Sequence, residues 1–302
     1  MKSSAIEGEI LDESQARSSV ARHLGMEVAA LDRIDRNVEG MVVMTLDAIQ
    51  KFDQPLTRER LFFWHKSLFL AGKTKIRVGG WRRGAVQVVS GPMGLETVHF
   101  EAPAAHQVDG EMGQFIHWIN HDTKIDLVLK AALAHLWFVT IHPFEDGNGR
   151  IGRAIVDLLL ARSENSPNRC YSLSAQIQKE RKGYYAILEK TQKGTLDVTH
   201  WLEWFFSCLG RAIAGAASIL DKVVQKTQFW DAHVKMPFNE RQRKIINRLL
   251  DGFEGKLTSS KWAKMAKCSQ DTAYRDILDL IERGVLSQNE GGGRSTSYSL
   301  VL

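Results

Sequence analysis

The residues best suited to chemistry lie together in one segment, residues 142–153, HPFEDGNGRIGR. The Asp-Gly-Asn-Gly stretch at 146–149 is flanked by apolar runs, and its glycines let successive backbone N–H groups turn toward one anion. A helix that begins near Gly149 adds the positive end of its dipole. The backbone of this loop therefore has the parts of a phosphate-binding site.

The side chains around the loop extend that chemistry. Arg150 and Arg153 are three residues apart, so they share a helix face from which guanidinium groups can fork onto phosphate oxygens. Asp146 offers the hard oxygen ligand that Mg²⁺ prefers, and His142 is the residue type that accepts a hydroxyl proton near neutral pH. This set is what in-line transfer from a nucleoside triphosphate to a hydroxyl requires. A plain turn explains the loop alone and leaves the histidine and arginines unexplained.

The elements that must position this segment are predicted to be mostly helices. Apolar residues at helical spacing predict helices from about Ser18, over 29–50, over 56–70 with Thr57 as N-cap, over 125–140, from 151 onward, over 183–191 and over 198–220. The Val-rich, glycine-punctuated stretch from 76 to 100 breaks this pattern and predicts a β-hairpin over Val86–Phe100.

The segment resembles the Fic-family signature HxFx(D/E)GNGRxxR. It matches every specified position, namely His142, Phe144, Asp146, Gly147, Asn148, Gly149, Arg150 and Arg153. The resemblance extends over roughly residues 20–210 and implies a mostly α fold, a Fic-type helical bundle with a β-hairpin flap. It also implies a protein adenylyltransferase, a nucleotidyltransferase that transfers AMP from ATP to a Ser, Thr or Tyr hydroxyl of a target protein.

The resemblance also implies a role for each site residue. His142 would be the general base and Asp146 the Mg²⁺ ligand. The phosphates would be bound by Gly147, Asn148, Gly149, Arg150 and Arg153, and the adenine would be bordered by Tyr184 or Tyr185. The hairpin would be a target-docking flap that pairs with an extended segment through Val86, Gln87, Val88 and Val89; a purely structural hairpin is the alternative. Another donor, removal of AMP from the target, and a nucleotide-sensing DNA-binding regulator also stay open.

An inhibitory helix is a second expectation from the resemblance. Fic proteins often carry the pattern (S/T)xxxE(G/N), and residues 35–40, DRNVEG, match it at Glu39 and Gly40, with Asp35 in the Ser/Thr position. A glutamate that pairs with Arg153 would keep this arginine from the γ-phosphate. We therefore predict that Glu39 holds the enzyme off; a solvated charge on an amphipathic helix is the alternative.

Five parts are expected along the chain. They are a flexible leader at 1–17, N-terminal helices with the inhibitory helix at 18–75, the Fic catalytic core at 76–230, a linker at 231–238 and a small winged helix-turn-helix domain at 239–302. The last prediction rests on three helical runs followed by two short β runs around Gly291–Gly293. Gln270, Asp271, Thr272 and Arg275 would lie on the exposed leading end of its third helix.

The partner of this C-terminal domain stays open at this point. Lysines and an arginine are available to DNA phosphates, namely Lys256, Lys261, Lys264, Lys267 and Arg294. Acidic residues dilute that charge, namely Asp271, Asp276, Asp279 and Glu282. DNA binding and docking to a protein, including a homodimer, therefore remain alternatives.

Composition sets the remaining limits. The chain has 302 residues, 44% of them hydrophobic and 25% charged, which is a globular composition, and its net charge of +5 does not by itself indicate nucleic acid. The cysteines, Cys170, Cys208 and Cys268, are too far apart in sequence for a zinc or CxxC pattern. Neither a signal peptide nor a membrane span is apparent, so a cytoplasmic protein is expected.

Overall fold

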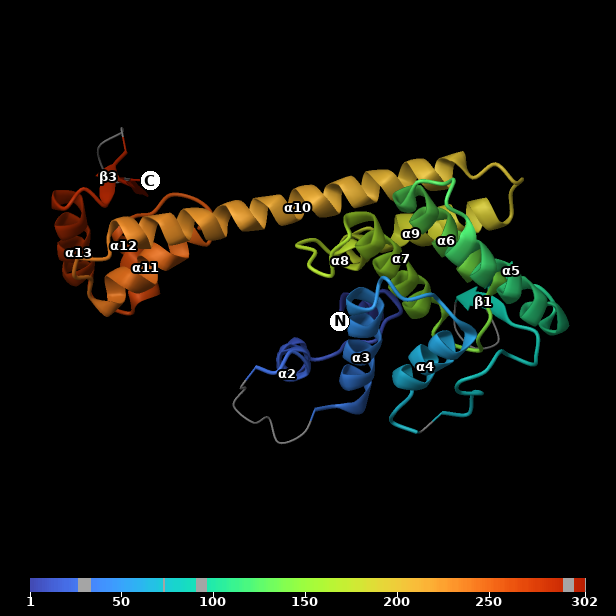
Figure 1. The fold of residues 1–302 in the computed structure, drawn as a ribbon. Coiled ribbons are helices and arrows are strands. Elements are labelled where there is room, and N and C mark those ends of the chain that lie inside the picture. The colour runs from blue at the N-terminus through green and yellow to red at the C-terminus, as the bar shows by residue number, and fades with distance from the viewer. Residues whose placement is uncertain (27–33, 73, 91–96, 290–295, 302) are drawn as a thin grey trace. The chain divides into compact units, whose positions relative to one another are not determined.

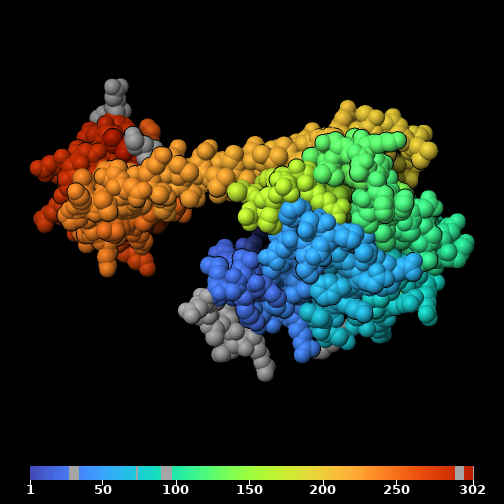
Figure 2. Space-filling view, in the orientation of Figure 1, coloured from blue at the N-terminus to red at the C-terminus, as the bar shows by residue number. Residues whose placement is uncertain are grey.

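A computed structural model describes residues 1–26, 34–72, 74–90, 97–289 and 296–301; the others are drawn in grey in Figures 1 and 2. The chain divides into two compact units, residues 1–214 and 215–302. The division falls within the long helix α10 (Thr199–Ala232) and not at the predicted linker, 231–238, which contains the end of that helix.

The first unit is built from helices and one β-hairpin. Its helices are α1 (Lys2–Ile6), α2 (Glu13–His23), α3 (Arg36–Gln50), α4 (Arg58–Leu68), the 3₁₀ helix η1 (Ala105–Gln107), α5 (Val108–His121), α6 (Leu127–Ile141), α7 (Asn148–Glu164), α8 (Leu173–Lys179), α9 (Arg181–Gln192) and the first part of α10. Strands β1 (Gln87–Ser90) and β2 (Thr97–Glu101) pair antiparallel, with Val88 opposite Phe100. The predictions of a mostly α fold and of this hairpin are confirmed.

Side chains fix where the helices begin. The Thr57 hydroxyl accepts a hydrogen bond from the Arg60 amide at 3.1 Å, as predicted for the start of α4. Helix α3 begins at Arg36 because the Asp35 carboxylate caps it, accepting from the Asn37 amide at 2.7 Å. The predicted helix over 29–50 therefore holds from 36 onward, while 27–33 lie outside the described residues.

Helices α6 and α7 form the centre of this unit. Helix α6 is apolar on nearly every side, which is the pattern of a buried helix. Gly152 lets α7 approach it closely, since a Cβ there would lie 3.2 Å from His135 Nδ1 and from Val139 Cγ1. The loop that joins α6 to α7 is thus held between two tightly packed helices.

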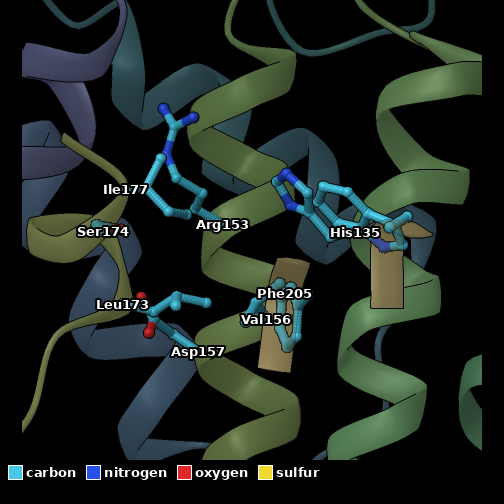
Figure 3. Close-up of a pocket in the computed structure, with 9 residues that line it drawn as sticks. His135, Arg153, Val156, Asp157, Leu173, Ser174, Ile177 and Phe205 are labelled. Carbon is cyan, nitrogen blue, oxygen red and sulfur yellow. The ribbon is translucent and has the colours of Figure 1, made fainter. Parts of the chain in front are cut away.

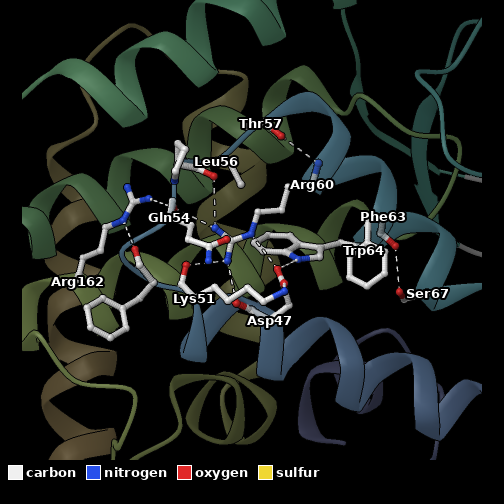
Figure 4. A network of polar contacts seen from close by, with 12 residues as sticks. Asp47, Lys51, Gln54, Leu56, Thr57, Arg60, Phe63, Trp64, Ser67 and Arg162 are labelled. Atoms are coloured by element: carbon white, nitrogen blue, oxygen red, sulfur yellow. Dashed lines mark hydrogen bonds and ion pairs between the residues drawn. The ribbon is translucent and has the colours of Figure 1, made fainter.

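A polar network fixes α3 and α4 to this centre (Figure 4). Asp47 Oδ2 of α3 accepts from Arg60 Nε at 2.8 Å and from Trp64 Nε1 at 2.7 Å, both on α4. Arg162 of α7 donates to the backbone carbonyls of Phe52 at 2.5 Å and of Gln54. The short connection between α3 and α4 is therefore held from both sides.

Residues 1–17 differ from the predicted flexible leader. They contain α1 and the start of α2, which is capped by Asp12. Ile6 of α1 is completely buried in the core, and α1 packs against α7 and α8. Burial of the Ile6 side chain therefore holds α1 against α7 and α8.

The second unit has its own core. Its elements after α10 are α11 (Glu240–Leu250), α12 (Ser259–Ala266), α13 (Gln270–Glu282), β3 (Leu286–Gln288) and β4 (Tyr298–Leu300). The two strands pair antiparallel, and Leu257 adds a bridge to Tyr298. Trp262 and Ile277 are fully buried between the helices. Three helices followed by a two-stranded sheet is the predicted element order; Gly291–Gly293 and Arg294 lie outside the described residues.

Candidate active site

His142 is the C-cap of α6, and both its backbone conformation and a hydrogen bond of its ring are defined. It adopts left-handed backbone angles, φ 51° and ψ 58°, at the C-cap. Its Nδ1 lies 3.1 Å from the Val139 carbonyl oxygen, which can only accept, so Nδ1 carries the proton and Nε2 keeps a lone pair. Burial lowers the pKa of His142, which keeps the ring neutral near pH 7. A neutral imidazole with a free Nε2 is a competent general base.

The loop after His142 is held by Phe144 and Asn148. Phe144 is completely buried. Asn148 Oδ1 accepts from the Phe144 amide at 2.9 Å, and Asn148 Nδ2 donates to the Phe144 carbonyl at 2.8 Å. Gly147 takes φ 85° at the N-cap of α7. Because the Asn148 side chain is engaged with Phe144, its contribution to an anion site is its backbone N–H in the first turn of α7.

His65 supports the same loop, and the sequence reasoning missed it. Its ring stacks on Phe144 with centroids 4.1 Å apart. Nε2 donates to the Asp146 carbonyl at 3.1 Å, while Nδ1 accepts from the Gly79 amide at 2.9 Å. Burial lowers the pKa of His65 to about 4, so the ring stays neutral in this arrangement. A histidine in the apolar run of α4 was the available signal.

Asp146 and Arg150 lie next to each other where the loop joins α7. Asp146 Oδ2 is 3.3 Å from Arg150 Nη2, and the Asp146 side chain is 58% exposed, so a metal ion can reach it. Arg150 Nη1 donates to Glu9 Oε2 at 2.9 Å, and its guanidinium lies over the Phe69 ring. Glu9, Asp146 and Arg150 line one pocket.

Arg153 is buried and held by α1 and the residue that follows it. Its Nε donates to Ser3 Oγ at 2.7 Å, its Nη2 to the Ser3 carbonyl at 2.9 Å, and Nη2 lies 2.8 Å from Glu7 Oε1. Figure 3 shows Arg153 on α7 beside His135 of α6. Burial alone would lower the pKa of Arg153, but the Glu7 charge raises it, so the guanidinium stays charged.

Glu7 lies over the first turn of α7. A Cβ at Gly149 would be 2.2 Å from Glu7 Oε1. Tyr185 donates a second hydrogen bond to Glu7 Oε2, at 2.8 Å. Burial raises the pKa of Glu7, but the Arg153 charge and these hydrogen bonds outweigh it, so the net shift is downward. A carboxylate therefore occupies the helix N-terminus that the sequence assigned to phosphates.

The predicted pairing of Glu39 with Arg153 is wrong. Glu39 Oε2 accepts from Ser19 Oγ at 2.6 Å, and Oε1 lies 2.7 Å from His23 Nε2, so the carboxylate joins α3 to α2. Gly40 is needed for a different reason, since a Cβ there would lie 1.7 Å from the Ser67 carbonyl oxygen of α4. This Glu-Gly pair serves helix packing.

The inhibitory pattern has a better match that the sequence reasoning passed over. Residues 3–8, SSAIEG, place Ser3, Glu7 and Gly8 at every specified position of (S/T)xxxE(G/N). The polar composition of residues 1–17 predicts a flexible leader and hides this match. The signal available in the sequence was Ile6, a large apolar residue beside the glutamate.

The two tyrosines differ in their surroundings. Tyr184 is 1% exposed, and its hydroxyl lies 2.8 Å from His135 Nε2, so it packs in the core. Tyr185 is partly buried and reaches Glu7. Of the two predicted adenine contacts, Tyr185 is the one with exposed surface for a ligand.

A pocket joins His142 to the hairpin. Both strands of the hairpin, the segment that holds His142 and Gly149, Glu7, and α9 contribute to its lining. The lining includes Val88 and Val89 of β1, His99 of β2, and Arg181, Tyr185 and Glu189 of α9. His99 Nδ1 of β2 lies 2.7 Å from Glu189 Oε2 of α9, so the hairpin is fixed beside the pocket. Val86 and Gln87 belong to the same hairpin but do not line this pocket.

The first unit thus brings His142, the N-terminus of α7 and two arginines of α7 together around one loop. Residues 55–160 match the sequence model of the Fic/DOC family, and residues 1–26 match a domain of unknown function, DUF4172. The chain therefore contains a Fic domain.

Several curated proteins are similar to this chain. A probable protein adenylyltransferase of Aquifex aeolicus is 32% identical over 101 residues, which is 32% of this chain and 31% of that protein. The protein adenylyltransferase Fic of Drosophila virilis is 26% identical over 217 residues, 69% of this chain and 40% of that protein. The chain thus spans less than half the length of these relatives.

Solved structures share the fold. A Fic family protein from Desulfovibrio desulfuricans G20 has a TM-score of 0.54 at 22% identity, covering 99% of this chain and 84% of that one. A Fic-domain signalling protein from Bacteroides thetaiotaomicron has a TM-score of 0.54 at 23% identity, over 71% of this chain and 82% of that one.

Two absences hold within the described part of the chain. No group of three or more His, Cys, Asp or Glu side chains is arranged to hold a metal ion. None of the described helices combines the length and the apolar character that crossing a bilayer demands.

Proposed function

We propose that this chain is a protein adenylyltransferase that transfers AMP from ATP to a hydroxyl of a target protein. The observation that carries the proposal is the position of Glu7: its carboxylate lies over the first turn of α7 and on Arg153, so the site already binds an anion where phosphates would lie. The curated relatives named adenylyltransferases support the same activity.

The proposed step is an in-line displacement. The acceptor oxygen bonds to the α-phosphorus, the bond from that phosphorus to the α,β-bridging oxygen breaks, and pyrophosphate leaves. The hydroxyl proton passes to His142 Nε2, whose lone pair is free because Nδ1–H is bound to the Val139 carbonyl. Backbone N–H groups of the loop and the first turn of α7 stabilise the phosphate charge.

Both arginines retain donors for this role. Arg153 Nη1 and Arg150 Nε are buried and have no hydrogen-bond partner among the described residues. A buried N–H without a partner is destabilising, and a phosphate oxygen would satisfy it. Arg153 and Arg150 therefore fit a polyphosphate better than they fit their present carboxylates alone.

Mg²⁺ fits the site as a companion of the nucleotide. Asp146 would hold it, because its exposed carboxylate is the hard ligand at the mouth of the loop, and one protein carboxylate is typical when substrate phosphates and water supply the rest. The bound ion would neutralise part of the polyphosphate charge. The hydrogen bond from the Gly147 amide to Asp146 Oδ1 orients this carboxylate.

We further propose that Glu7, and not Glu39, inhibits the enzyme. In its present position Glu7 pairs with Arg153 and repels an incoming phosphate from the N-terminus of α7. Glu9 adds a second contact of the same kind by holding Arg150. Gly8, at φ 89°, turns the chain so that both carboxylates face α7.

The hairpin would dock the target. Residues Val86, Gln87, Val88 and Val89 would offer backbone groups to an extended segment, with Val88 and Val89 facing the His142 pocket. Tyr185 would border the adenine once Glu7 has moved.

Label transfer tests the proposal directly. We expect the Glu7→Gly protein, incubated with a cell lysate, to transfer label from α-labelled ATP and not from γ-labelled ATP. Addition of His142→Ala to Glu7→Gly should abolish transfer. Transfer of the γ label, or α-label transfer that survives His142→Ala, would overturn the assignment.

A further inference from the structure

The second unit exposes a run of lysines with no acidic residue among them. Residues 255–270 contain Lys256, Lys261, Lys264 and Lys267 and neither Asp nor Glu. All four lysines are exposed. Lys261 and Lys264 are three residues apart on α12, so they share one face of that helix. This run is a local positive surface that the modest net charge of the chain does not reveal.

The acidic residues of α13 oppose this charge less than the sequence suggests. Asp276 is bound by Arg241, with Nε to Oδ2 at 2.8 Å and Nη2 to Oδ1 at 3.0 Å. Asp279 Oδ2 accepts from Arg283 Nη1 at 2.8 Å and from Gln242. Two of the four acidic side chains on this helix are therefore neutralised by internal ion pairs.

The same contacts fix the orientation of α13. Asp276 is 6% exposed and also accepts from Asn239 Nδ2 at 2.9 Å, so one face of α13 is attached to the start of α11. The opposite face remains exposed at Gln270, Asp271, Tyr274, Arg275 and Leu278. At the leading end, Gln270 Nε2 donates to Ser260 Oγ of α12 at 2.9 Å, which holds the two helices of the turn together.

The exposed face of α13 carries side chains that can form hydrogen bonds with the edges of base pairs. Glutamine and arginine are side chains that form paired hydrogen bonds with adenine and guanine in the major groove. A helix of thirteen residues is about 20 Å long and fits that groove. In a helix-turn-helix the second helix lies in the major groove and the first crosses the phosphate backbone. Here α13 corresponds to the second helix and α12, with Lys261 and Lys264, to the first.

We propose that the second unit binds duplex DNA, with α13 in the major groove and Lys256, Lys261, Lys264 and Lys267 on the phosphates. The proposal does not depend on the adenylyl transfer proposed above. The charge of the surface favours DNA as the occupant, because the four exposed lysines match a polyanion and the internally paired Asp276 and Asp279 do not oppose it. Asp271 is the acidic residue that remains exposed on the face of α13.

The test uses the full chain and a mixed-sequence duplex of about 30 base pairs, long enough to span several helical turns. Fluorescence anisotropy is followed between 50 and 200 mM salt. Four phosphate contacts predict that affinity falls roughly a hundredfold over this range. Lys261→Glu with Lys264→Glu should weaken binding at 50 mM and reduce the salt-dependent loss to roughly tenfold, because two contacts are removed.

A charge-matched control separates a site from general electrostatics. Lys222→Glu with Lys235→Glu changes the net charge by the same amount at exposed lysines outside the α12–α13 pair, and it should leave the salt dependence nearly unchanged. Thermal unfolding of each variant confirms that the unit is folded. No binding to the duplex at 50 mM salt, or equal weakening by both double variants, would overturn the proposal and favour docking to a protein.

Discussion

The two Glu-Gly pairs of the first unit, Glu7-Gly8 and Glu39-Gly40, have the same sequence but different contacts. Glu7 follows the last residue of α1, so its carboxylate projects onto α7 and meets Arg153, while Gly8 is free of neighbours and turns the chain at φ 89°. Glu39 lies in the first turn of α3 and faces α2, while Gly40 is pressed against α4. Of these two pairs, the first contacts α7.

The difference teaches that the surface that the helix faces decides what a segment of the pattern (S/T)xxxE(G/N) contacts. Both segments carry a polar residue four positions before the glutamate, Ser3 in one and Asp35 in the other. Ser3 uses its hydroxyl and carbonyl on Arg153, whereas Asp35 caps its own helix. A short motif therefore specifies a local shape, and packing decides what that shape contacts.

The largest effect is expected on the free energy of unfolding, at Gly40 of the second pair. Gly40→Ala should lower the free energy of unfolding by about 3 kcal/mol or more, since the new Cβ would overlap the Ser67 carbonyl oxygen. Gly8→Ala should lower it by about 1 kcal/mol, because its cost is only the left-handed backbone. Urea unfolding measures both; a similar loss at the two positions would contradict the comparison.

The next largest effect is expected at the first pair, on activity. Glu7→Gly should raise the initial rate of AMP transfer by about tenfold to a hundredfold, since charge-assisted hydrogen bonds of about 1.5–3 kcal/mol are removed. Glu39→Gly is the matched control and should stay within about twofold of the wild-type rate, because Glu39 does not contact Arg153. Activation by Glu39→Gly and not by Glu7→Gly would reverse the assignment.

The pH dependence of the rate of the Glu7→Gly protein tests the role of His142 once the Glu7 carboxylate is absent. Burial lowers the pKa of His142 from its usual 6.5, so the neutral, proton-accepting form persists below pH 6.5. The rate of the Glu7→Gly protein should therefore fall by less than half between pH 7.5 and 6.5, which is less than a ring of ordinary pKa would give. It should decline about tenfold per pH unit once the pH is below the lowered pKa. A rate that already halves at pH 6.5, with the protein still folded, would show that the ring titrates normally.

The smallest effect is expected at Glu9. Glu9→Gln removes one charge from the pair with Arg150 at a partly exposed position, so the rate should rise only about twofold to fivefold in the otherwise unchanged chain. In the Glu7→Gly background the added gain should be smaller, because the segment no longer holds Arg153. An increase larger than that from Glu7→Gly would make Arg150 the controlling contact.

The sequence by itself determined the loop between α6 and α7 and most of the helices. Residues 142–153 are consecutive, and the buried helices on either side leave the connecting loop little freedom, so the types and spacing of His142, Asp146 and Arg153 were enough to predict the site. The Thr57 cap and the hairpin are likewise set by short-range rules of hydrogen bonding and alternation.

Only the tertiary structure decided which glutamate reaches Arg153. The two candidate segments are both short, polar at the surface and able to form a helix, so local propensity does not distinguish them. Burial of Ile6 holds α1 against α7 and α8, and the close approach of Gly40 to Ser67 holds α3 against α4. These contacts join residues that are distant in sequence. The packing of α1 brings Glu7 to Arg153, and the packing of α3 leaves Glu39 facing α2.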